Sequence, residues 1–295
     1  MNSTDITLRN RSKRRKQLAF AYALVAPSFL LVLLIVGYPI FNVIVDSFKI
    51  PKTDPQQWGF DHYVYLFTNK ASVNNLIFTL QIVIVTVLLA TVIAFGLALY
   101  LRFFDTRVSK SIGILYLLPR FIPGLVAVNA MIIVIRNSGF INRLSLALFN
   151  YDFKPEIMNT GTALVMMNLW FNIPFATMII SSALSSIPDS MIESARDVGA
   201  KKIHILFTMI IPLVMKDIMI AVTFIFMGNV GSFTTPYLMG PTAPKMLSPH
   251  LFSMFQNMHY ERSAALSVVM FLLCSVSAIV YIYTNMKEQE WEHGG

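Results

Sequence analysis

Few residues of this sequence combine the side-chain chemistry and spacing that catalysis or metal binding requires. The single cysteine, Cys274, lies inside an apolar stretch, and the histidines are scattered: His62, His204, His250, His259 and His293. No HExxH or GxSxG string occurs, so neither a zinc peptidase nor a nucleophile elbow is indicated. The sequence also lacks a Walker A loop, so this chain cannot hydrolyse ATP. We therefore predict no enzyme, no metal site and no cofactor bound by this chain.

The most informative polar segment runs from Ser186 to Pro212. Pro188 and Asp189 suit a first helical turn, where a carboxylate meets the helix dipole, and Gly199 stands where a left-handed residue ends a helix. Apolar residues between them share one face and charged residues the other: Met191, Ile192, Ala195 and Val198 against Glu193, Arg196 and Asp197. We expect a short amphipathic helix leading into a second helix, although an ordinary loop on the headgroups fits the same periodicity.

Other polar residues interrupt apolar stretches and form the candidate pathway set: Arg120, Asn168, Trp170, Asn172, Asn229, Ser232 and Thr234. Polar groups inside a membrane usually face the helix bundle, and Ser232 and Thr234 suit an unwound segment that lines a cavity. Two alternatives remain open. Trp170 also suits the membrane interface, and Arg120 can snorkel or bond a carbonyl that a neighbouring proline leaves free.

These residues must be positioned by helices in a lipid solvent. Of the 295 residues, 56% are hydrophobic and 13% are charged, against about 25% charged in a soluble domain. Six segments are long enough to cross a bilayer, which needs roughly 20 apolar residues: about 18–43, 76–101, 111–135, 162–186, 209–231 and 264–286. The prediction is all-α, a polytopic membrane protein with six transmembrane helices. We expect kinks at six prolines: Pro27, Pro39, Pro119, Pro123, Pro174 and Pro212.

The cations predict the orientation. With the N-terminus inside, 13 of the 23 Lys and Arg residues lie in the inner segments 1–16, 102–110, 187–208 and 287–295, and 8 lie in the longer outer loops. This bias predicts both termini in the cytoplasm. Residues 1–17 are then a basic cytoplasmic segment, 18–286 the transmembrane domain and 287–295 a cytoplasmic tail. A signal peptide fits poorly because the first apolar run is too long, and no basic stripe indicates nucleic-acid binding.

The segment between the fourth and fifth spans resembles the EAA loop of ABC importer permeases, the binding-protein-dependent subunits of the maltose or sugar type and of the polyamine type. The matching residues are Glu193, Ser194, Ala195, Asp197, Gly199, Ala200, Phe207, Ile211 and Pro212. Ser194 replaces the usual alanine. The resemblance implies that the loop is a cytoplasmic coupling helix that docks on an ATPase subunit, with Glu193 bonding a basic group there and Gly199 permitting the turn.

The same resemblance implies a heteromeric importer in a prokaryotic cytoplasmic (inner) membrane. Expected partners are a second homologous permease, a dimer of cytoplasmic ATPase subunits that bind ATP-Mg, a solute-binding protein outside the membrane, and lipid. A stand-alone channel or secondary carrier is the rival class and would need no ATPase.

For the cargo we favour a carbohydrate or related polar solute, held by Trp170 and the neighbouring amides. The element Gly139-Phe140-Ile141-Asn142 also resembles sugar permeases, whereas residues 229–241 look like polyamine- and iron-type permeases. We expect no acidic residue in a span interior, which argues against a polyamine. If Arg120 contacts the cargo, an acidic or phosphorylated solute would suit it.

Overall fold

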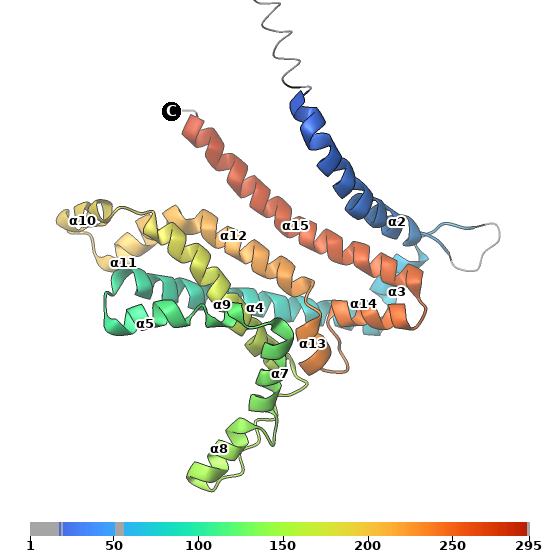
Figure 1. Ribbon diagram of the computed structural model, residues 1–295, viewed down its shortest axis with the longest axis horizontal. Coiled ribbons are helices and arrows are strands. Elements are labelled where there is room, and N and C mark those ends of the chain that lie inside the picture. Colours follow the sequence, from blue (N-terminus) through green and yellow to red (C-terminus); the bar gives the residue numbers. More distant parts are fainter. Residues whose placement is uncertain (1–17, 19, 51–55, 294–295) are drawn as a thin grey trace, which may run out of the picture.

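The computed structural model describes residues 18, 20–50 and 56–293. Within these ranges, the backbone alone is described for residues 280 and 283–293. Within them the chain is helical and contains no strand (Figure 1). Six helices are long and apolar enough to cross a membrane: Phe20–Asp46, Lys70–Phe103, Gly124–Phe149, Gly161–Ser185, Lys202–Val230 and Tyr260–Ile279. The predicted all-α class with six candidate spans is confirmed. The predicted basic segment 1–17 lies outside the described residues.

The centre of the fold is the packing of α4 (Lys70–Phe103) on α9 (Gly161–Ser185), with α12 (Ile211–Val230) against both. Ala90, Ala94 and Ala98 follow one another at every fourth residue of α4 and are fully buried. Lipid is as apolar as a side chain, so spans associate through close packing, which small residues permit. This alanine stripe lets the α4 and α9 backbones approach.

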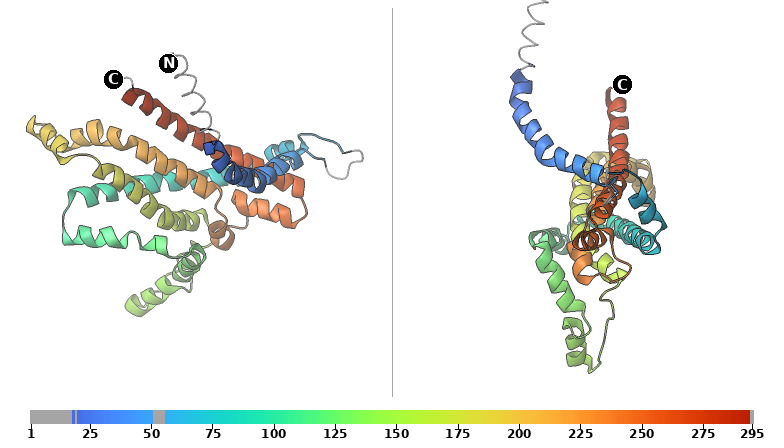
Figure 2. Two further views of the ribbon diagram at one scale, coloured as in Figure 1. Left: turned by 45° about the horizontal axis from the view of Figure 1, so that its top comes forward. Right: turned by 90° about the vertical axis from the view of Figure 1, so that its right-hand side faces the viewer.

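The first helix lies at the edge of the bundle. It contains the π-helix η1 (Leu33–Gly37) and α2 (Tyr38–Asp46), and it packs mainly on α15 (Tyr260–His293), as Figure 2 shows. No residue from 20 to 46 is buried. Its exposed apolar side chains are suited to lipid or to another membrane subunit.

The predicted third span, 111–135, is not one helix. It divides into α5 (Arg107–Leu115), α6 (Leu118–Phe121) and α7 (Gly124–Ile135), and α8 (Phe140–Phe149) follows. The break comes at Ile122, which has φ −91° and ψ 124°, because the residue before a proline, here Pro123, avoids the helical region. In Figure 1, α5 runs back beside α4, while α7 and α8 project from the bundle.

Two of the other prolines follow π-helical turns. Pro39 lies two residues after the end of η1, and Pro212 lies two residues after the end of η2 (Leu206–Ile210). A proline provides no N–H for the regular α-helical ladder, and a π turn changes that ladder locally. The helix therefore continues past both prolines, and it also runs through Pro174 inside α9.

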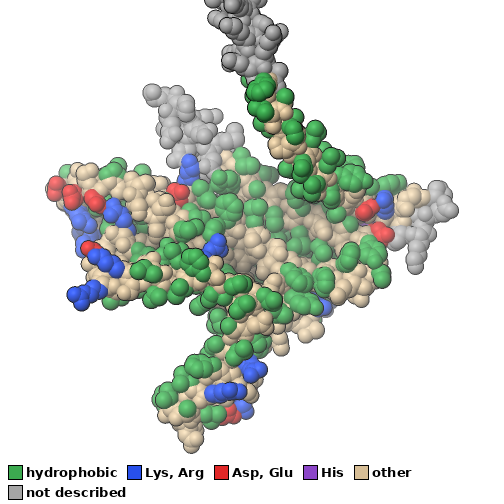
Figure 3. Space-filling view, viewed as in Figure 1, with side chains coloured by type: hydrophobic (Ala, Val, Ile, Leu, Met, Phe, Trp, Pro, Cys, Tyr) green, Lys and Arg blue, Asp and Glu red, His purple; other side chains and the backbone are tan. Residues whose placement is uncertain are grey.

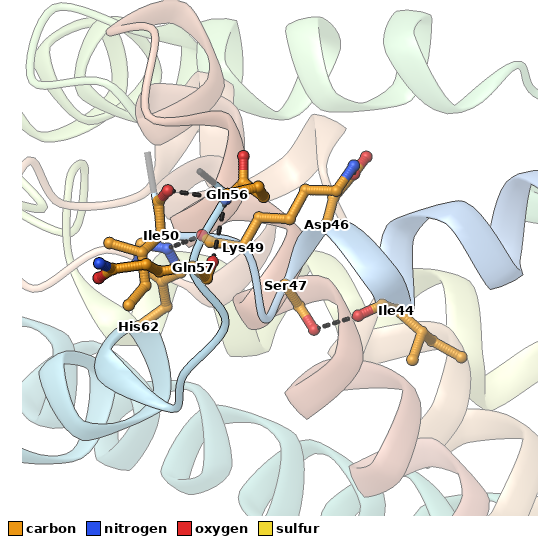
Figure 4. Close-up of polar contacts among 8 residues, drawn as sticks. All are labelled: Ile44, Asp46, Ser47, Lys49, Ile50, Gln56, Gln57 and His62. Atoms are coloured by element: carbon orange, nitrogen blue, oxygen red, sulfur yellow. Dashed lines mark hydrogen bonds and ion pairs between the residues drawn. The ribbon is translucent and has the colours of Figure 1, made fainter. Parts of the chain in front are cut away.

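Short helices close the two ends of the bundle. Between α9 and α12 lie α10 (Asp189–Asp197) and α11 (Lys202–Ile205). At the opposite end lie α3 (Asp61–Thr68), α13 (Thr234–Met239) and α14 (Leu247–Gln256). The loop before α3 is held by hydrogen bonds (Figure 4): Gln56 Nε2 donates to the Ile50 carbonyl over 2.9 Å, and His62 Nε2 lies 2.8 Å from the Lys49 carbonyl.

Charged side chains gather at the end with α10 and the α4–α5 turn and again on α8, while apolar side chains cover the surface between them (Figure 3). One expectation about charge is wrong. Asp217 lies half-buried inside the fifth span, Lys202–Val230, and it also falls within the predicted range 209–231. The assumption that no acidic residue lies in a span interior therefore fails.

Candidate functional site

The turn after α10 has the geometry predicted from Gly199. Its φ is +86°, and the Gly199 N–H donates to the Arg196 carbonyl at 2.8 Å. The Ala200 N–H reaches back to the Ala195 carbonyl at 3.1 Å. These two bonds form a Schellman motif, which satisfies the last carbonyls of a helix through a left-handed residue. A Cβ at Gly199 would meet no atom within 4 Å, so the backbone angle alone demands glycine.

The apolar face of α10 is only partly buried. Ile192 is 5% exposed and Ala195 packs against the core, but Met191 and Val198 are exposed, Val198 to 84%. Periodicity placed these four residues on one face, and the bundle covers that face at Ile192 and Ala195 but leaves Met191 and Val198 exposed. The helix touches the bundle along one narrow line, because it lies beyond the ends of α9 and α11.

The charged face of α10 is open. Glu193, Ser194 and Asp197 are exposed, and none of the ion pairs found in the described residues involves Glu193 or Asp197. Met191 and Val198 on the other face are exposed as well, so α10 presents both carboxylates and apolar side chains to its surroundings. Such a surface suits a protein partner with a basic group near an apolar groove.

Within the bundle, the predicted asparagines meet between α9 and α12. Asn172 Nδ2 donates to the Asn168 carbonyl at 2.7 Å and lies 3.4 Å from Asn229 Oδ1. Asn229 Nδ2 in turn donates to the Ile225 carbonyl. Asn168 is 3% exposed, and its buried Nδ2 has no hydrogen-bond partner. The cluster therefore keeps one free donor.

The remaining pathway candidates lie apart from this cluster. Arg120 is exposed, with its guanidinium 5.3 Å from the centre of the Phe175 ring on α9, and Trp170 is 41% exposed. Ser232 belongs to the unwound link between α12 and α13, as predicted, and Thr234 begins α13. A nearby cavity of about 310 Å³ is lined instead by residues of α13, α14 and the loop between them.

The Gly139–Asn142 element forms more than a plain turn. A Cβ at Gly139 would come within 2.5 Å of the Ile133 carbonyl oxygen, so only glycine fits. Asn142 is 5% exposed and donates to Asp152 Oδ1 at 2.7 Å and to the Phe153 carbonyl at 2.8 Å. Hydrogen bonds from Lys154 and Asn142 lower the pKa of Asp152. The element fastens α8 to the chain that follows it.

Two anchoring residues were not identified from the sequence. Asn75 Oδ1 accepts from the Lys245 N–H at 2.8 Å, and Thr79 Oγ1 accepts from the Leu247 N–H at 2.9 Å. Both side chains lie on α4 and tie the α13–α14 loop to it, about 170 residues away in sequence. On α14, burial and the nearby Lys245 charge lower the pKa of His250. Long-range pairs of this kind leave no local sequence signal.

Comparisons with known proteins agree with this arrangement. Residues 87–286 match the family model described as binding-protein-dependent transport system inner membrane component. The spermidine/putrescine transport system permease protein PotB of Escherichia coli (strain K12) is 24% identical over 207 residues, covering 70% of this chain and 75% of PotB. The sulfoquinovosyl glycerol transport system permease protein SmoG of Agrobacterium fabrum is 27% identical over 286 residues, with 89% of each chain covered.

The fold is also that of a solved transporter chain. A chain of a bacterial ABC transporter involved in the import of the acidic polysaccharide alginate superposes with a TM-score of 0.77 at 18% identity, covering 95% of this chain and 99% of that one. Six apolar spans, the helical architecture and the family match over two thirds of the sequence lead to one assignment. The chain belongs to the binding-protein-dependent inner membrane components, the permease subunits of ABC importers.

Proposed function

We propose that this permease forms half of the translocation pathway for a carbohydrate or a related polar solute, and that it couples to a cytoplasmic ATPase through α10 and the turn at Gly199. The observation that carries the coupling role is the open face of α10 between the fourth and fifth spans. Its carboxylates are exposed on this face, Met191 and Val198 are exposed on the other, and a Schellman motif ends the helix.

In this proposal Glu193 accepts a charge-assisted hydrogen bond from a basic group of the ATPase. Closure of an ATPase pair on ATP moves α10, and the bundle changes access as a rigid body. A second, homologous permease supplies the other half of the pathway, and a solute-binding protein delivers cargo at the end with α13 and α14. Both termini face the cytoplasm, and 18–286 forms the transmembrane domain.

The coupling proposal is tested by co-purification from the native host through a C-terminal tag. We expect a second six-span protein and a soluble Walker-type ATPase, and loss of the ATPase from a Glu193→Ala, Gly199→Pro double variant. Lys110→Met is the matched control, because it removes an exposed ion pair with Asp105 at the same end of the molecule. Purification of the chain alone would contradict the importer proposal and favour a channel or secondary carrier.

A carbohydrate cargo is supported by the amide cluster and by one group of relatives. Asn172 and Asn229 place an amide donor and acceptor together in the bundle, and the buried Nδ2 of Asn168, one turn from Asn172, has no hydrogen-bond partner. SmoG, by its name, serves a sulfoquinovosyl glycerol system. The exposed guanidinium of Arg120 adds a contact that suits an acidic sugar.

A polyamine cargo is the alternative, and two observations favour it. PotB, by its name, belongs to a spermidine/putrescine system, and Asp217 supplies a carboxylate within the fifth span. Uptake by whole cells separates these possibilities with labelled spermidine, a neutral disaccharide and a uronic acid oligomer as probes. Arg120→Ala should reduce uptake of the acidic oligomer about tenfold and spare a neutral sugar. Equal loss for both would exclude an anion contact.

A further inference from the structure

Three helices meet at one side chain, Arg102, in the last turn of α4. Its Nε donates to the Leu184 carbonyl at 3.3 Å, and its Nη2 donates to the Ile187 carbonyl at 3.1 Å. The same Nη2 forms an ion pair with Asp189 Oδ1 at 2.6 Å. Leu184 belongs to the last turn of α9, and Asp189 is the first residue of α10. The partners are 82 to 87 residues away in sequence.

Each of these contacts pairs a backbone or charged group at a helix end. The last carbonyls of α9 have no partner within their own helix, and a guanidinium supplies several donors in a fixed plane. A carboxylate in the first turn of α10 is favoured by the helix dipole. Arg102 therefore fastens the cytoplasmic end of α4 to the end of α9 and to the start of α10.

Few other contacts hold α10. Ile192 is its single buried residue among those described, Ala195 packs against the core, and the chain leaves α10 at Pro188 and at the Gly199 turn. Without Arg102, the link before Pro188 is a point at which α10 can pivot. The Asp189 side chain is 71% exposed, so the pair adds little to global stability. The pair instead fixes the orientation of α10 relative to α4 and α9.

We propose that Arg102 is a positioning residue for energy coupling: its bonds to Asp189, Leu184 and Ile187 make α10 move as one body with α4 and α9. The inference rests on the proposed coupling role of α10. A movement imposed on α10 by an ATPase then reaches both core helices directly. With the bonds broken, α10 swings on its connections, and ATP binding moves it without moving the bundle.

The test is a distance measurement by double electron–electron resonance on the complex captured from the native host. Spin labels are placed at Ser190→Cys on α10 and at Val92→Cys on α4, in a Cys274→Ser background. Both positions are exposed and lie outside the residues assigned to ATPase docking, and Cys274 is the only native cysteine. Distances are recorded without nucleotide and with ATP and vanadate.

With Arg102 and Asp189 intact, we expect a narrow distance distribution whose centre is the same in both states. Asp189→Asn and Arg102→Met should broaden it and shift its centre when ATP and vanadate are added, although the ATPase still co-purifies. Asp189→Glu keeps the ion pair and should behave as the native chain, and Lys110→Met is the matched control. Thermal unfolding of the complex should be unchanged in Asp189→Asn.

Two results would overturn the inference. One is a shift with ATP and vanadate in the native chain itself, which would show that α10 does not move with α4. The other is an Asp189→Asn distribution as narrow and constant as the native one. Failure of the ATPase to co-purify with the native chain is a separate outcome, because it contradicts the proposed function before the role of Arg102 is reached.

Discussion

Substitution of Gly199 by alanine isolates one backbone angle. Gly199 has φ +86°, and a Cβ there meets no atom within 4 Å, so Gly199→Ala adds no steric overlap with a neighbouring group. The cost is conformational: an L-residue in the left-handed region loses about 1–2 kcal/mol. If docking requires this turn while the undocked loop can relax, the apparent affinity for the ATPase falls by about 5- to 30-fold.

The matched control is Gly228→Ala in α12. A Cβ at Gly228 also meets nothing within 4 Å, and its φ is not positive. Alanine within a helix is favoured over glycine by about 0.5–1 kcal/mol, so this variant should keep or raise stability. Gly199→Asn should fall between native and Gly199→Ala, because asparagine tolerates the left-handed region.

The assay measures ATPase captured on the tagged chain as the ATPase concentration is varied, with permease level normalised in the membrane. Native binding by Gly199→Ala would refute the requirement for the left-handed turn. An equal loss in Gly228→Ala would show that the effect belongs to glycine content rather than to the angle at Gly199.

Three further outcomes follow from buried polar groups. Asn142→Ala should lower the free energy of unfolding by about 1–3 kcal/mol, because two hydrogen bonds are lost; thermal unfolding in detergent measures this, and an unchanged midpoint would contradict it. Thr86→Val should raise the unfolding midpoint, because the fully buried Thr86 hydroxyl has no partner and its removal relieves a desolvation cost of about 1–3 kcal/mol. Since burial lowers the pKa of His250, the unfolded chain binds the proton more readily. Stability should therefore fall as the pH drops below about 6.5, and His250→Gln should flatten that decline in unfolding midpoints.

Features set by local sequence were predictable. Six apolar runs predicted six spans because bilayer thickness fixes the length that a helix needs. Gly199 was identifiable as a left-handed stop because it follows the last residue of an amphipathic pattern. The break at Ile122 is also encoded locally, by Pro123. Because membrane helices tolerate proline, the sequence analysis predicted only a kink at this position.

Features set by contacts between distant segments were not predictable in the same way. Periodicity placed Met191 and Val198 on the apolar face of α10, but it could not show how little of that face the bundle covers. Arg102 read as one more cation at the cytoplasmic end of a span, since its partners come more than 80 residues later. Asp217 was visible in the sequence and fell within the predicted span 209–231, so it was overlooked rather than hidden by a distant contact.

The two candidate sites share one continuous helix. Arg102 caps α9 at Leu184, and the same helix carries Asn172 twelve residues earlier, which at 1.5 Å per residue is about 18 Å along its axis. The helix is continuous through Pro174, so under the proposed coupling a tilt of its end at Leu184 reaches the amide cluster along one element. Asn172 lies close to Asn229 on α12, so a shift of α9 against α12 changes which polar groups are paired. Movement at α10 can thereby alter a polar contact deep in the bundle without any chain of small rearrangements between the sites.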